Sequence, residues 1–293
     1  MYLTGFADEA AKGIDGQIRA TKELGWKYIE ARNINDKNII DIPNAEFDIV
    51  VKKLENAGIK INCFGSTIAN WAKQIIDSDE TSFEEVKRAI PRMQRLGTKL
   101  IRIMSYAVLE DREPDDQMEK KRFEQLRLFV KTFSDAGITA VHENCMNYGG
   151  MGWRYTIRLI ENVPGLRLVF DTGNPVFNYD RSKPKPWHKQ SSFEFYKNVK
   201  DYISYIHIKD GVWDEKEKKS KFTFPGEGDG DVFKIVKDLL DTGYNGGFSI
   251  EPHMSVVLHD NSIVASEENK YTNYIEYGHR FEKLVEKAKR VKT

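Results

Sequence analysis

A recurring glycine constrains the fold of this chain more than any other feature of its sequence. At six places a helical pattern ends near a glycine, and a short apolar run typical of a strand follows. These glycines are Gly25, Gly58, Gly97, Gly137, Gly165 and Gly243. Glycine readily adopts the left-handed conformation that ends a helix, so it suits a short link from a helix to a strand. The pattern therefore predicts repeated units in which strands and helices alternate.

Eight strands are expected in all, because two further apolar runs belong to the same pattern. The predicted strands are Tyr2–Phe6, Tyr28–Arg32, Ile59–Phe64, Lys99–Met104, Ile138–Asn144, Leu166–Asp171, Tyr202–Ile208 and Phe248–Glu251. Eight strand–helix units in 293 residues are typical of a closed parallel (β/α)8 barrel, an α/β fold. An open doubly wound sheet is the alternative, but no Gly-x-Gly-x-x-Gly motif follows the first strand. No linker or low-complexity segment is visible, so we expect a single barrel domain over residues 1–293.

Charge and cysteine content argue against several classes of protein. Lysine plus arginine equals aspartate plus glutamate at 45 each, so the net charge is zero. A balanced charge argues against nucleic acid or an anionic membrane as the main partner. The N-terminus lacks a basic segment followed by an apolar one, and no apolar run approaches membrane-spanning length. Cys63 and Cys145 fit a reducing compartment. We therefore expect a cytoplasmic protein, and a homo-oligomer stays open.

Four polar residues stand at the exits of the last four predicted strands: Glu143, Asp171, His207 and Glu251. In a parallel barrel these exits converge on one mouth. A carboxylate there is costly to bury unless a charge or a metal meets it. Each residue alone is well explained as a helix cap or a structural side chain. Three carboxylates with one imidazole form a ligand set for Mn²⁺, Mg²⁺, Co²⁺ or Zn²⁺, so the four together favour one divalent metal ion.

The order of the motifs resembles that of the xylose-isomerase-like TIM barrel superfamily. The motifs are His-Glu-Asn at 142–144, Asp-Thr-Gly-Asn at 171–174, His-Ile-Lys-Asp at 207–210, Pro-Gly-Glu-Gly-Asp at 225–229 and Ser-Ile-Glu-Pro at 249–252. Phe-Ala-Asp-Glu at 6–9 also fits this resemblance, which spans the whole chain. The likeness is strongest to the sugar isomerase/epimerase group that includes ketose 3-epimerases.

The resemblance implies a metal-dependent isomerase or epimerase acting on a small sugar. Glu143, Asp171, His207 and Glu251 would hold the metal, and the two glutamates would also face each other across the substrate. One glutamate would remove a proton next to the carbonyl, giving an enediolate, and the other would return a proton.

Two departures from the pattern concern the substrate contacts. Many relatives carry a histidine three residues after the aspartate of the sixth strand, where this chain has Asn174. Many epimerases also carry an arginine shortly after the histidine of the seventh strand, and residues 210–213 contain none. A metal-dependent dehydratase acting on a keto-inositol is therefore the alternative.

Two further functions are less favoured. An apurinic endonuclease would need three zinc ions, many histidines and a basic surface, whereas this chain has six histidines and no net charge. A sugar-binding barrel without catalysis would lack one of the two glutamates.

Six residues near the strand exits are candidates for binding the substrate: Asn174, Lys209, His142, Asn144, Glu227 and Arg102. Each also has a structural explanation. Neighbours on a strand point to opposite faces, so His142 and Asn144 need not share the direction of Glu143. Lys209 could pair with Asp210 or Glu227, and Arg102 must find an acid.

The loop at 226–231 favours an unphosphorylated ketose or polyol derivative. Its glycines could offer amides to a phosphate, but its three carboxylates would repel a dianion and are expected to cap the following helix. The residues after the eighth strand, 252–255, include no lysine or arginine. The sequence leaves the identity of the sugar open.

Overall fold

Eight parallel strands form the centre of the computed structural model, which describes residues 1–78, 80–254 and 265–291. The strands are β1 Tyr2–Gly5, β2 Tyr28–Ala31, β5 Lys60–Gly65, β6 Leu100–Ile103, β7 Thr139–Glu143, β8 Arg167–Asp171, β9 Ile203–Ile208 and β12 Gly247–Ile250. All eight predicted strands are confirmed within one residue at either end. The hydrogen-bonded order is β1-β12-β9-β8-β7-β6-β5-β2.

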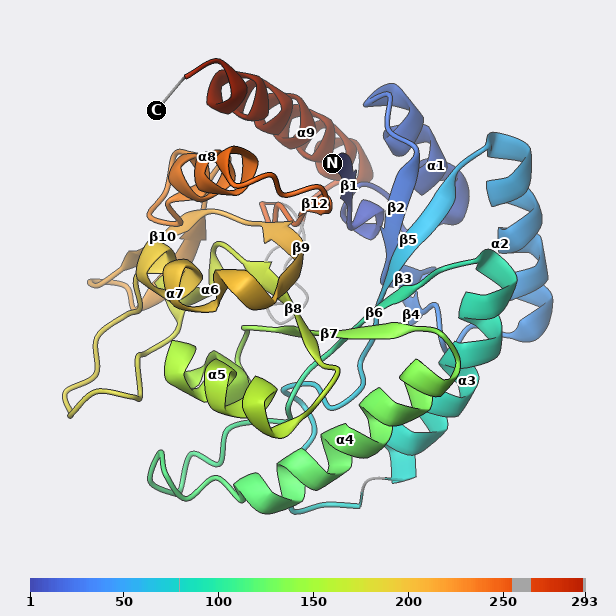
Figure 1. Cartoon of the computed structure of the whole chain (residues 1–293). Helices are drawn as coiled ribbons and strands as arrows, with labels where there is room; N and C mark the ends of the chain where they lie inside the picture. The colour runs from blue at the N-terminus through green and yellow to red at the C-terminus, as the bar shows by residue number, and fades with distance from the viewer. Residues whose placement is uncertain (79, 255–264, 292–293) are drawn as a thin grey trace.

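The two strands at the ends of this order, β1 and β2, meet and close the sheet. A parallel bridge joins Phe6, just after β1, to Glu30 in β2. The strands therefore form a barrel, and helices surround it (Figure 1). This confirms the predicted (β/α)8 architecture.

The helices follow the strands in alternation. They are α1 Ile14–Glu23, α2 Asn44–Ala57, α3 Glu80–Leu96, α4 Glu119–Asp135, α5 Trp153–Asn162, α6 Asn174–Phe177, α7 Ser192–Val199, α8 Val232–Asp241 and α9 Glu267–Arg290. Short 3-10 turns add η1 Ala7–Glu9, η2 Tyr148–Met151 and η3 Lys200–Tyr202. None of these helices combines the length and the hydrophobicity that crossing a membrane requires. The six glycines of the sequence pattern all have positive φ, between 68° and 87°, as expected for residues that end helices.

Inside the barrel, a small apolar layer lies beneath its mouth. Cys63, Val141, Val169 and Tyr205 form this buried cluster. Side chains two residues apart on a strand share a face. Glu143, Asp171 and His207 therefore continue the inward-facing rows of β7, β8 and β9 toward the strand exits. The pleat alone directs these three groups into the barrel.

Two short hairpins follow barrel strands, one after β2 and one after β9. The first pairs β3 Asn33–Ile34 with β4 Lys37–Asn38, and the second pairs β10 Gly211–Asp214 with β11 Lys219–Phe222. Residues 214–221, almost all of them charged, largely belong to the second hairpin, and residues 215–219 are exposed. The loop after β12 lies mostly outside the described residues, so the prediction that it brings no cation to the site stays a prediction.

Candidate functional site

The structure brings together the four residues predicted from the strand exits. Glu143, Asp171, His207 and Glu251 each offer one ligand atom, and these atoms all lie within 4.8 Å of one another. All four residues are buried. They come from β7, β8, β9 and the residue after β12, and these four strands are consecutive in the sheet, so parallel pairing brings their exits together.

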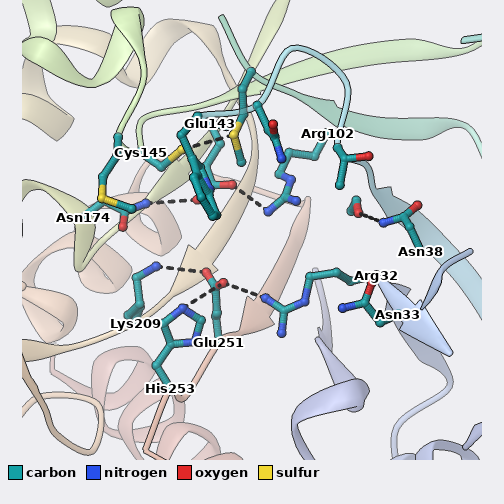
Figure 2. Close-up of a pocket in the computed structure, with 16 residues that line it drawn as sticks. Arg32, Asn33, Asn38, Arg102, Glu143, Cys145, Asn174, Lys209, Glu251 and His253 are labelled. Atoms are coloured by element: carbon teal, nitrogen blue, oxygen red, sulfur yellow. Dashed lines mark hydrogen bonds and ion pairs between the residues drawn. The ribbon is translucent and has the colours of Figure 1, made fainter. Parts of the chain in front are cut away.

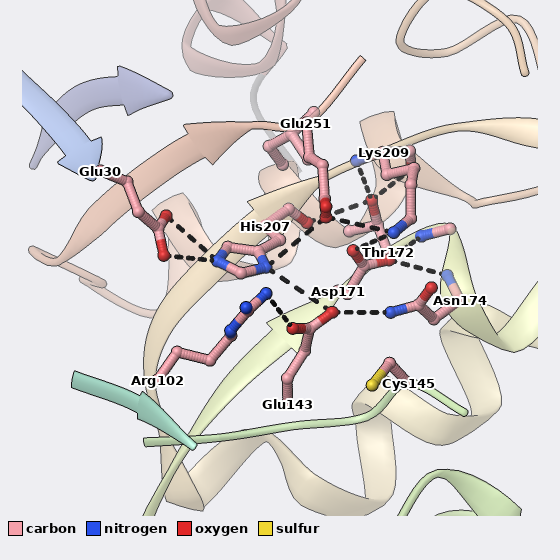
Figure 3. Close-up of polar contacts among 12 residues, drawn as sticks. Glu30, Arg102, Glu143, Cys145, Asp171, Thr172, Asn174, His207, Lys209 and Glu251 are labelled. Atoms are coloured by element: carbon pink, nitrogen blue, oxygen red, sulfur yellow. Dashed lines mark hydrogen bonds and ion pairs between the residues drawn. The ribbon is translucent and has the colours of Figure 1, made fainter. Parts of the chain in front are cut away.

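His207 is oriented by Glu30, which lies across the barrel on β2 (Figure 3). Both Glu30 oxygens lie 3.1 Å from Nε2 of the ring. The other nitrogen, Nδ1, is buried and has no hydrogen-bond partner among the described residues. It points to the cluster, 4.0 Å from Glu143 Oε1 and 3.8 Å from Glu251 Oε2. A carboxylate that holds one ring nitrogen while the other remains free is the usual environment of a metal-binding histidine.

Glu143 is held by one charged and one neutral donor. Arg102 Nη1 donates to Oε2 at 2.8 Å, and Asn174 Nδ2 donates to Oε1 at 3.0 Å. Burial alone would raise the pKa of Glu143, but Arg102, His207 and Lys209 outweigh it and hold the pKa below its usual value. Glu143 is therefore ionised and able to accept a proton.

Glu251 is held in the same way by two cations. Arg32 Nη1 donates to Oε1 at 3.0 Å, and Lys209 Nζ donates to Oε2 at 3.1 Å. Burial opposes ionisation, but Lys209, His253 and Arg32 hold the pKa of Glu251 well below its usual value. The two glutamates face each other from opposite sides of the cavity, Glu143 beside Arg102 and Glu251 beside Arg32 (Figure 2).

Asp171 is fixed by its own turn and by β7. Its Oδ1 accepts from the N–H groups of Gly173 and Asn174 at 2.8 and 2.7 Å. The Asn144 amide bonds both the N–H and the carbonyl of Asp171, at 2.7 and 3.0 Å. Burial raises the pKa of Asp171 to about 6, although Lys209, 2.9 Å from Oδ2, opposes the shift.

The charge of the cluster fits a divalent cation. Enclosed carboxylates outnumber enclosed permanent cations in this part of the described structure by six to three. The carboxylates are those of Asp8, Glu9, Glu30, Glu143, Asp171 and Glu251, and the cations are Arg32, Arg102 and Lys209. Without a metal, burial opposes protonation of His207, but Glu30, Glu143 and Glu251 raise its pKa to about 9. A divalent ion would replace that proton and offset the excess negative charge.

A second group of possible ligands, Glu9, Glu251 and His253, lies beside the first. Arg32 already neutralises it, with Nη2 donating to Glu9 at 3.1 Å and Nη1 donating to Glu251 at 3.0 Å. His253 Nδ1 lies 3.0 Å from Glu9 Oε1. Arg32 therefore already neutralises the second group, whereas the first group could hold a metal ion.

A cavity of about 130 Å³ adjoins this group of four residues, and Glu143 and Glu251 are part of its lining. Figure 2 shows how its lining is divided, with Asn174 and Lys209 at one side and the arginines at the other. Three predicted substrate-binding residues line it: Arg102, Asn174 and Lys209. The sequence left open an ion pair of Lys209 with Asp210 or Glu227. The structure shows neither, because the Lys209 side chain turns inward to Asp171 and Glu251.

The structure corrects the placement of the other three predicted substrate contacts. His142 points away from the cavity, and its Nε2 lies 3.0 Å from Ser105 Oγ and from Asn147 Oδ1. Burial lowers the pKa of His142 to about 4, so the ring is a neutral structural group. Asn144 is occupied by the backbone of Asp171.

Glu227 is the third correction. Its side chain is exposed and pairs with Arg280 of α9 at 2.6 Å. It does not line this cavity, because its loop turns it outward to the helix.

Sequence reasoning missed Glu30 and Arg32, two residues of the first half of the chain that bind His207 and Glu251. Glu30 and Arg32 lie at the end of β2, and Asp8 binds Arg32 Nε at 2.9 Å. The Phe6 ring lies below the Arg32 guanidinium at 4.2 Å. One signal was available, since Glu30 and Arg32 are charged residues in a strand expected to be buried.

Asp210 also has a role that the sequence did not reveal. Its carboxylate accepts from the N–H groups of Gly211, Gly226, Gly228 and Gly230 at 2.8–3.1 Å. The glycine-rich loop after β9 therefore wraps around a carboxylate of the protein. The expected cap by a loop carboxylate is not observed at Asp231, whose side chain makes no capping hydrogen bond to α8.

Comparison with known proteins gives one family and several similar folds. Residues 18–291 match the model of a family described as xylose isomerase-like TIM barrel. No curated protein matches the sequence significantly. A xylose isomerase-like TIM barrel protein from Mycobacterium smegmatis, solved in complex with magnesium, superposes with a TM-score of 0.70. It is 17% identical, and the match covers 98% of this chain and 97% of that one.

Two enzymes have similar structures. D-psicose 3-epimerase from Clostridium cellulolyticum H10, solved with D-tagatose, has a TM-score of 0.66 and 15% identity over 97% of this chain and 99% of that one. A probable 3-DHS dehydratase, AsbF of Bacillus anthracis, has a TM-score of 0.66 and 13% identity over 93% of this chain and 97% of that one. At these identities the likeness is one of fold.

Proposed function

The chain belongs to the xylose isomerase-like TIM barrel family, and from its barrel mouth we propose that it is a divalent-metal-dependent sugar isomerase or epimerase. It would move a proton next to a carbonyl through an enediolate, on an unphosphorylated ketose or polyol derivative. The observation that carries the proposal is the environment of His207. Its Nε2 is held by Glu30, and its free Nδ1 faces three carboxylates.

Glu143, Asp171, His207 and Glu251 would hold the metal ion. When bound, Mn²⁺, Mg²⁺, Co²⁺ or Zn²⁺ would polarise the substrate carbonyl and make the adjacent C–H more acidic. Proton transfer, positioning of the carboxylates and binding of the substrate oxygens would be carried out by side chains of the protein.

Glu143 and Glu251 are the proposed base and acid, because both are kept ionised and lie on opposite sides of the cavity. One would take the proton from the carbon next to the carbonyl. The other would return a proton to the opposite face of that carbon, giving an epimer, or to the neighbouring carbon, giving an isomer. Arg102 and Arg32 would keep the two carboxylates in position. Asn174 and Lys209, which also line the cavity, would bind substrate oxygens.

The position of Asp210 supports the proposal that the substrate carries no phosphate. Backbone N–H groups of a glycine-rich loop are a common phosphate site in barrels. Four such groups around this loop already donate to Asp210. A phosphate there would compete with a buried carboxylate and be repelled by it.

A keto-inositol dehydratase is the second candidate, and Asn174 favours it. The amide at this position cannot take or give a proton, although it reaches Glu143 Oε1. A dehydratase needs one carboxylate to remove the α-proton and a donor to the departing hydroxyl. The Lys209 ammonium, in the same cavity, could be that donor.

Metal analysis followed by a hydrogen-exchange screen tests the proposal. The purified protein is expected to carry about one divalent ion per chain. Incubation with ketoses in D₂O should place deuterium next to the carbonyl of the true substrate, as seen by NMR. An epimer or aldose product supports the first function, and an unsaturated ketone supports the second. Protein without bound metal, or full activity after chelation, would contradict both.

A further inference from the structure

A second chamber adjoins the cavity that Glu143 and Glu251 help to line. It has a volume of about 480 Å³, against about 130 Å³ for the inner cavity. Trp71, Cys145 and Met146 line both spaces, so the two are continuous along one wall. The chemistry proposed above needs only the carbons next to a carbonyl to lie between Glu143 and Glu251. The larger chamber is therefore free for a part of the substrate that does not react.

The lining of this outer chamber combines rings with hydrogen-bonding groups. Trp71, Phe177 and Tyr179 supply aromatic rings. Tyr179 is 40% exposed, so its ring is accessible from the chamber. Gln74 and Asn178 supply amides. A sugar ring offers a C–H face to aromatic rings and hydroxyl edges to amides and cations. The mixed lining matches a sugar ring better than a purely apolar group.

Lys189 gives the chamber a donor that no carboxylate neutralises. Its Nζ lies 3.7 Å from the ring centre of Tyr179 and 3.6 Å from that of Trp213, and it donates to Phe177 O at 2.5 Å. No carboxylate of the described residues lies within ion-pair distance of it, although Glu215 is near enough to act on its charge. By contrast, Arg181 in the same chamber is paired with Glu110 at 2.6 Å.

The chamber wall is built in advance. Tyr179 and Lys189 form an antiparallel bridge, and the N–H of Asp180 donates to His188 O at 2.9 Å. Gln190 Nε2 donates to Gly150 O at 2.8 Å and to Tyr179 O at 3.2 Å, which ties this wall to η2. The backbone that carries Tyr179 and Lys189 is therefore ordered without a ligand, which reduces the ordering cost of binding.

We infer that the substrate is a glycoside-like sugar in which the reacting keto sugar carries a second sugar unit, bound in the outer chamber between Trp71, Tyr179 and Lys189. This inference rests on the proposed function for the position of the reacting unit. It adds that the enzyme acts on a disaccharide-type molecule rather than on a free ketose.

Binding measurements test the inference separately from catalysis. The probes are fructose and a set of disaccharides in which glucose is joined to fructose through each free hydroxyl in turn. Dissociation constants are measured by NMR or calorimetry on the full chain in buffer containing magnesium. At least one disaccharide should bind about tenfold more tightly than fructose, the size expected for an added ring–aromatic contact.

Variants locate the extra affinity. Tyr179→Ala and Lys189→Met should each reduce the ratio of disaccharide to fructose affinity by about fivefold to tenfold. Tyr271→Ala, on α9 and outside both spaces, is the matched control and should leave the ratio unchanged. Circular dichroism on each variant confirms that the fold is kept.

The outcomes separate the two proposals. If no sugar exchanges hydrogen but the disaccharide preference persists and depends on Tyr179, the proposed reaction is wrong and the outer sugar site stands. If every disaccharide binds no better than fructose, or none binds, the inference is overturned. It is also overturned if phenyl glycosides bind more tightly than the disaccharides, because the chamber would then hold an aromatic group.

Discussion

The two halves of the barrel contribute different kinds of residue to the same site. The second half, β7, β8, β9 and β12, provides the four proposed metal ligands. The first half provides groups that hold three of them. Glu30 on β2 holds His207, Arg32 after β2 holds Glu251, and Arg102 on β6 holds Glu143.

This division shows two different constraints on the residues. The ligands must be oxygen or imidazole groups, because the metal accepts little else. Glu30, Arg32 and Arg102, the holders of these ligands, need only complement the charge of the group that they contact, so one is an anion and two are cations. Each holder is far from its partner in the sequence: Glu30 and His207 are 177 positions apart, and Arg102 and Glu143 are 41 positions apart. The following predictions test whether substitution of a ligand lowers activity or metal affinity more than substitution of a holder.

The largest effect is expected for the two ligands that would also move protons. Glu143→Gln and Glu251→Gln each keep the size of the side chain but remove the base. The turnover number should fall by roughly 10²–10⁴-fold, the usual contribution of a positioned base. Activity and deuterium incorporation are measured together, with circular dichroism to show that the fold is kept. Exchange lost in only one variant would mean a single base.

The next effect concerns the ligands alone. Asp171→Asn and His207→Gln should lower metal affinity by more than about 100-fold, beyond the effect of changing a residue that merely supports a ligand. Metal content after dialysis, measured by mass spectrometry, is the readout. Full metal content in both variants would remove these residues from the metal site.

A holder should matter less than a ligand. Glu30→Gln weakens the grip on His207 Nε2 while leaving Nδ1 in place, so metal affinity should fall by about 10–100-fold. Glu85→Gln is the matched control, because Glu85 is also buried but pairs with Lys73, and neither residue lines the cavity. An unchanged affinity in the Glu30 variant would break the proposed link between the two halves.

A smaller loss of activity is expected when a holder is replaced by a residue of the same charge. Arg102→Lys retains a cation near Glu143 but loses the second donor, which reaches Ser66 O at 3.0 Å. The loss of one charged hydrogen bond should lower kcat/KM by about tenfold. Metal content should remain close to that of the unchanged protein. A loss of metal as large as in the Asp171 variant would make Arg102 part of the metal site itself.

The smallest effect is expected at Glu227, which lies outside the site. Its ion pair with Arg280 is exposed, and such pairs contribute little. Glu227→Gln should therefore change kcat/KM by less than about twofold. A tenfold loss would show that this loop reaches the substrate after all.

The course of the strands and the identity of the ligands were readable from the sequence because both depend on local patterns. Gly137, for example, ends a helix by its own conformational freedom, and the apolar run after it is typical of a buried strand. Glu143 then follows Val141 on the same face, so its inward direction is a consequence of the pleat. The corrected placements of His142 and Asn144 show the limit of this reasoning, since alternation sends them away from the cavity but does not say what they meet.

The partners across the barrel were decided by tertiary structure. Nothing near Arg32 in the sequence indicates Glu251, and nothing near Lys209 indicates Asp171 rather than Asp210. The Lys209–Asp171 pair joins the ends of the neighbouring strands β8 and β9. The Arg32–Glu251 pair forms because the parallel bridge between Phe6 and Glu30 closes the sheet and brings the end of β2 near that of β12. A buried charge takes the opposite charge that closure places within reach, and that distance is a property of the closed barrel rather than of either strand.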